Sequence, residues 1–72
     1  MVLHVGDAVK VKPEYLEKGE ANRVSVVVDA WEDARGEVIT IVDADQVARR
    51  ERGELGIVPQ FTTSADYYEK VV

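Results

Sequence analysis

The sequence predicts an all-β domain: a small five-stranded barrel with a long central hairpin and one or two short helical turns. The first observation is the block Val24–Asp43, in which two β-branched runs flank Asp33-Ala34-Arg35-Gly36, a typical hairpin turn. The second is a series of short apolar runs separated by Gly and Pro. The third is size, because in a chain of 72 residues closure into a barrel removes exposed sheet edges.

The long hairpin is expected to be apolar on both sides. With Ala34–Gly36 as a three-residue loop, Asp33 faces Glu37 and Trp31 faces Ile39. In this register one face carries Val26, Val28, Ala30, Val42 and Ala44, and the other carries Val27, Trp31, Ile39 and Ile41. A four-residue loop regroups these residues but leaves both faces apolar. Such a hairpin must curl into a barrel, bury its second face under other segments, or meet another chain.

The N-terminal part is expected to hold one half-buried strand. Gly6 and Asp7 form a turn that opens the strand Ala8–Lys12, where valines alternate with lysines. Pro13 ends this strand because it cannot donate to a ladder. A polar connector, residues 14–23, leads to the hairpin.

The segment after the hairpin is ambiguous. Asp43 with Gln46 three residues later resembles a capping box, and Gly53 stands where a helix stops. Asp43–Arg52 is therefore either a short helix or a polar loop.

Two further strands are expected near the C-terminus. Leu55–Val58 is predicted as the fourth strand, ended by Pro59. Thr63 or Ser64 is the predicted N-cap of a single helical turn. Tyr68–Val72 then forms the closing strand.

Two stretches resemble SH3-like small barrels. Leu3-His-Val-Gly-Asp-Ala-Val-Lys-Val11 is similar to their opening, and Gly53-Glu-Leu-Gly-Ile-Val-Pro59 followed by Tyr68-Glu-Lys-Val71 is similar to the closing stretch of SH3 domains, where a one-turn helix and a Tyr precede the last strand. The resemblance implies one SH3-like domain over residues 1–72, closest in character to the small uncharacterised SH3-like proteins of bacteria and phages. The residues that build the proline-peptide groove are missing, so the resemblance does not imply that activity.

Composition narrows the class of protein. The formal net charge is −5, which opposes a nucleic-acid role because phosphate binding depends on Lys and Arg. The chain has no cysteine, and its longest uninterrupted apolar run, residues 26–28, is far too short to span a membrane. The first residues lack the basic and apolar regions of a secretory signal. A cytoplasmic location is the expectation.

Residues suited to catalysis or metal binding are few. His4 is the single histidine, so it has no histidine partner for a zinc or relay site. Asp43, Asp45 and Glu54 mimic part of a calcium loop, but Val47 and Ala48 occupy positions that need other residues. We expect no enzyme activity, no metal or other cofactor, and no small-molecule substrate.

Three groups of residues are candidates for binding. The first is a face formed by Trp31, Val27, Ile39 and Ile41, since exposed tryptophans mark interaction sites. The second is a basic island, Arg49, Arg50 and Arg52 with Gln46. The third is an aromatic patch, Phe61, Tyr67 and Tyr68 beside Pro59. Each group also has a simpler structural interpretation. The first and third groups would be part of the core, and the second would be a solvated surface.

The sequence favours a small non-catalytic protein-interaction or accessory module that self-associates as a homodimer. The alternative is a nucleic-acid-associated module of the SH3-like kind that uses Lys10, Lys12, Arg23 and the basic island.

Overall fold

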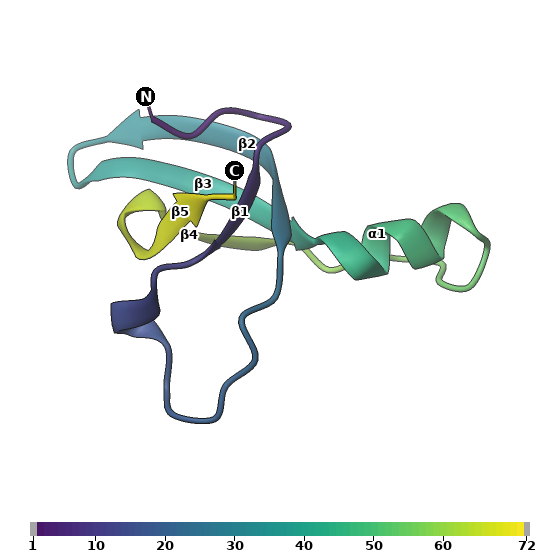
Figure 1. Ribbon diagram of the computed structural model, residues 1–72. Coiled ribbons are helices and arrows are strands. Elements are labelled where there is room, and N and C mark those ends of the chain that lie inside the picture. The colour runs from purple at the N-terminus through teal and green to yellow at the C-terminus, as the bar shows by residue number, and fades with distance from the viewer. Residues whose placement is uncertain (1, 72) are drawn as a thin grey trace.

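The computed structural model describes residues 2–71, and its main feature is one antiparallel sheet (Figure 1). The elements in chain order are β1 (Ala8–Val11), the 3-10 turn η1 (Pro13–Tyr15), β2 (Ser25–Asp33), β3 (Gly36–Asp43), α1 (Ala44–Glu51), β4 (Phe61–Ser64), the 3-10 turn η2 (Ala65–Tyr67) and β5 (Tyr68–Lys70). The prediction of a mostly β domain with short helical turns is confirmed. The predicted closing strand extended to Val72, which lies outside the described residues.

The sheet is open at both ends of its strand order. The five strands lie in the order β4-β3-β2-β1-β5, and every neighbouring pair is antiparallel. Within residues 2–71, no pairing between β4 and β5 closes the sheet into a barrel. The sheet therefore has the predicted number of strands, and barrel closure is not confirmed.

The hairpin of β2 and β3 has a different register from the predicted one. Asp33 pairs with Gly36, so Ala34 and Arg35 are the turn residues, and Trp31 pairs with Val38 rather than Ile39. The Asp33 carboxylate accepts a hydrogen bond from the Arg35 N–H at 2.8 Å, which stabilises the turn. Gly36 has a φ of +118°, as a glycine in this turn is expected to have. The turn was predicted at the right place, but the pairing was wrong.

The fourth strand lies further along the chain than the sequence suggests. Leu55–Val58 forms no strand, and β4 begins at Phe61, beyond Pro59. Thr62 and Thr63 pair with β3, which suits β-branched residues on a pleated surface. Of the two predicted N-caps of the following turn, Thr63 and Ser64, the structure has Ser64, whose hydroxyl accepts a hydrogen bond from the Asp66 N–H at 3.2 Å.

The ambiguous segment after the hairpin is a helix. Asp43 is its N-cap and accepts a hydrogen bond from the Gln46 N–H at 3.0 Å. Gly53 follows the helix with a φ of +80°, the conformation that commonly ends helices. In Figure 1, α1 projects away from the sheet and the chain turns back alongside it. We call α1 and the returning segment, residues 44–60, the arm.

The core lies on one side of the sheet. Its buried members are Leu3, Val9, Val27, Ile39, Ile41 and Ala65, with Ala30 and Tyr68 packed against them. Ile39, Val9 and Val27 are the largest fully buried side chains. The side of the hairpin that carries Val27, Ile39 and Ile41 is called the core face, and the opposite side is called the outer face.

Candidate interaction surface on the hairpin

A β-bulge in β2 decides which side chains share a face. Val27 pairs with Ile41, but the next paired residue of β2 is Asp29, which pairs with Thr40. Val28 is therefore an extra residue, and the alternation of side chains changes parity at this point. Ala30 consequently joins the core face, and Trp31 lies on the outer face.

The bulge divides the first predicted candidate group. Val27, Ile39 and Ile41 are buried in the core, with 5% exposure or less. Trp31 lies on the other side of the hairpin and remains 38% exposed. The predicted grouping of Trp31 with these three residues is therefore wrong: the two-residue turn places Trp31 on the opposite face from Ile39 and Ile41, and the bulge places it on the opposite face from Val27.

One end of the outer face is covered by the arm. Val42 of β3 and Val58 of the arm are both buried, at 7% exposure each. Between the hairpin and the arm lies a cavity of about 180 Å³, lined mainly by Val26, Val28, Val42, Val47, Val58 and Arg50. Part of the second apolar face is thus buried by another segment of the same chain, one of the three outcomes that the sequence allowed.

The other end of the outer face is open. Here Trp31 pairs with Val38, and β4 adds Ser64 beside Val38. A polar row separates this end from the cavity: the Thr40 and Thr62 hydroxyls share a hydrogen bond of 2.9 Å. The outer face therefore presents an exposed tryptophan at one end and an apolar cavity at the other.

A second cavity lies at the tip of the hairpin. It has a volume of about 270 Å³ and is lined by Asp33, Arg35, Glu37, Val38 and the three residues 62–64. Its lining residues include acidic, basic and hydroxyl side chains, and none of them is a histidine or a cysteine.

The basic island lies at the end of α1. Arg49 and Arg52 both pair with Glu54, with Nε–Oε distances of 3.6 and 2.6 Å. Arg50 instead lines the apolar cavity, and no carboxylate within residues 2–71 forms an ion pair with it. The three arginines predicted as one island therefore have two different environments.

The aromatic candidates are also separated by the fold. Phe61 begins β4 opposite Ile41 and is 61% exposed. Tyr67 makes an edge contact with Tyr15 of η1, with ring centroids 5.0 Å apart. Tyr68 packs against the core, and its burial raises its pKa above the ordinary value.

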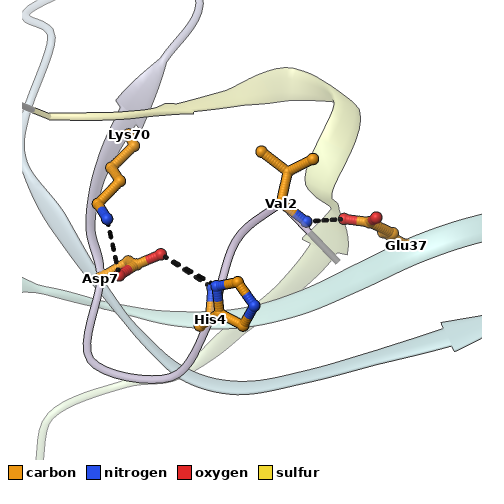
Figure 2. A network of polar contacts seen from close by, with 5 residues as sticks. All are labelled: Val2, His4, Asp7, Glu37 and Lys70. Carbon is orange, nitrogen blue, oxygen red and sulfur yellow. Dashed lines mark hydrogen bonds and ion pairs between the residues drawn. The ribbon is translucent and has the colours of Figure 1, made fainter.

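A small polar network fixes the N-terminal segment (Figure 2). The Asp7 carboxylate accepts a hydrogen bond from the His4 backbone N–H at 2.9 Å and pairs with the Lys70 ammonium at 3.6 Å. The His4 N–H, followed by the Lys70 charge, holds the pKa of Asp7 below its ordinary value of 3.8. The Val2 N–H donates to Glu37 at 3.4 Å. These contacts fasten residues 2–7 to β5 and β3, which is a structural role.

Sequence reasoning missed the residues that form the apolar cavity. Val47 and Val58 come from the arm, and their contact with Val26, Val28 and Val42 depends on how the arm folds back. The local signal for the returning segment is Val58 between Gly56 and Pro59, and this pattern favours a strand over Leu55–Val58.

Comparisons with known proteins identify no relative: no protein-family model, curated protein or solved structure matches this chain. Among residues 2–71, no group of three or more His, Cys, Asp or Glu side chains could hold a metal ion. The helices in the described part of the chain are too short to cross a membrane.

Proposed function

We propose that this chain is a small, non-catalytic protein-interaction module of the SH3-like kind, which acts in the cytoplasm and self-associates through the outer face of its hairpin. The observation that carries the proposal is the exposure of Trp31 on the outer face. Trp31 and Val28 are each 38% exposed, and beyond the polar row of Thr40 and Thr62 the same face holds a cavity lined mainly by valines. Exposed apolar side chains of this kind mark binding sites, and tryptophan is a frequent hot spot in interfaces.

The SH3-like part of the proposal has local support. The resemblance implies a one-turn helix, a tyrosine and a last strand near the C-terminus. The structure has η2 at Ala65–Tyr67, followed by Tyr68 as the first residue of β5. This agreement is limited to the closing segment. Because the sheet is open, an SH3-like barrel stays a proposal.

A nucleic-acid role has less support than self-association. The nucleic-acid alternative relies on six basic residues. Four of these lie within 4.0 Å of a carboxylate: Lys10, Arg23, Arg49 and Arg52. Their charges are largely compensated within the chain, whereas phosphate binding needs basic residues that can replace counterions. Retention on nucleic acid that falls steeply with added salt would favour the alternative.

The proposal is tested with a charge placed on the outer face. Trp31→Glu should give a folded monomer, because it removes the exposed aromatic side chain and leaves the core face unchanged. The matched control is Phe61→Glu, which places the same charge at a more exposed aromatic side chain (61% against 38%) on the core-face side of the sheet. This control should associate like the parent chain.

Sedimentation equilibrium gives the oligomeric state, and circular dichroism shows whether each variant is folded. A Trp31→Glu variant that is folded and associates as strongly as the parent contradicts the proposal. A variant that unfolds would place Trp31 in the core, which also contradicts it.

A further inference from the structure

We infer that self-association is reciprocal, with Trp31 of each copy inserted into the apolar cavity of the other. This inference rests on the proposed function and specifies its binding mode. The exposed side chain and the cavity lie at opposite ends of one face, so a two-fold symmetric contact can bring each into contact with the other copy reciprocally.

The cavity has the size and lining to accept one of the two fused rings of the Trp31 indole. Its volume is about 180 Å³, slightly larger than an apolar cavity of about 150 Å³ that binds benzene. Its walls include five valines, contributed by β2, β3 and the arm. The chain contains a single tryptophan, Trp31.

Trp31 does not line the cavity of its own chain. Val28, a cavity residue, lies three residues before Trp31 on β2, and Val42 lies four residues beyond its partner Val38 on β3. At about 3.4 Å per residue these separations are roughly 10 and 14 Å. Two copies can meet with their outer faces together and a two-fold axis along the row of Asp29, Thr40 and Thr62. In this arrangement each tryptophan lies opposite the cavity of the other copy.

The charges at the two ends of the face are complementary. Asp29 and Asp33 lie two residues to either side of Trp31 and, by alternation after the bulge, share its face. Arg50 lines the cavity without an ion-pair partner among residues 2–71. Insertion of Trp31 brings Asp33 to the end of the contact that holds this guanidinium, whereas Asp29 lies on the two-fold axis and faces Asp29 of the other copy. The attraction between Asp33 and Arg50 offsets part of the repulsion between two chains of charge −5.

Tryptophan fluorescence tests the insertion directly, because all tryptophan emission comes from Trp31. As concentration rises through the micromolar range, the emission of the parent chain should shift to shorter wavelength, and acrylamide should quench it less. The shift should follow the dimer fraction measured by sedimentation equilibrium.

Two variants test the cavity and its charge. Val28→Phe fills the cavity from its own wall, and Arg50→Glu reverses the charge at its rim. Each should weaken association by about tenfold or more and keep the long-wavelength emission. The matched control is Lys18→Glu, which makes the same change in net charge in the connector before β2 and should associate like the parent.

The outcomes separate the two proposals. If the parent associates but its emission does not shift, or if both cavity variants associate like the parent, the insertion is overturned and self-association stands. If Lys18→Glu weakens association as much as Arg50→Glu, the effect is one of net charge, and the pairing at Arg50 is overturned. If the parent remains a monomer, both the insertion and the proposed function are overturned.

Discussion

Replacing Gly36 with valine tests the conformation of the hairpin turn. Gly36 has a φ of +118°, where a β-branched residue is strained. A Cβ atom at this position would meet no other atom within 4 Å, so the cost comes from the backbone conformation alone. That cost is about 1–2 kcal/mol. Since 1 kcal/mol shifts the Tm of a small domain by about 4–8 °C, the expected fall in Tm is roughly 4–16 °C.

Gly56 provides a matched control for this substitution. It is the one glycine of the five without a positive φ, and a Cβ atom there also meets nothing within 4 Å. Gly56→Val should therefore leave the Tm unchanged or raise it slightly, because valine reduces the conformational entropy of the unfolded chain.

Thermal unfolding followed by far-ultraviolet circular dichroism measures both variants against the parent chain. The reasoning is refuted if Gly36→Val melts with the parent, since the strained residue of the turn would then lie elsewhere. It is also refuted if Gly56→Val loses as much stability, because the loss would then belong to any glycine replaced by valine.

Three further substitutions test the packing and polar contacts. Ile39→Ala removes a fully buried side chain and should lower the free energy of unfolding by about 2–5 kcal/mol in urea titrations; a loss within error would place Ile39 outside the core. Asp43→Ala removes the N-cap of α1 and should cost about 0.5–2 kcal/mol, seen as reduced helical signal, and an unchanged spectrum would refute the cap. Because the pKa of Asp7 is lowered on folding, its ionisation stabilises the protein above its ordinary pKa, and this contribution is lost as the pH falls through the lower folded value. The stability difference between the parent and Asp7→Asn should therefore shrink in acid, and a difference that is constant with pH would contradict the assignment.

The parts of the fold predicted correctly depend on short-range signals. The turn before Gly36 follows from residues adjacent in sequence, as does the N-cap of the short turn at Ser64. For α1 the sequence indicates both the cap Asp43 and the stop Gly53 but does not decide between a helix and a loop. Each of these features needs only a few neighbouring residues, so the sequence pattern contains it.

The parts predicted wrongly depend on pairing between distant residues. The bulge at Val28 has no glycine or other local signal, yet it places Trp31 on the opposite face from the buried Val27. The fourth strand is Phe61–Ser64 because these residues pair with β3, while Val58 packs across the outer face. The sequence indicates Trp31 as a candidate but not the cavity, because the cavity forms only where the arm meets the hairpin.

Sedimentation equilibrium of the unmodified chain, from low to high micromolar concentration and at two salt concentrations, tests the central claim of self-association most directly. The account predicts that the mean mass rises from 8.0 kDa toward twice that value, and that added salt leaves most of the association intact because the contact is mainly apolar. A single species of 8.0 kDa at every concentration would contradict the account.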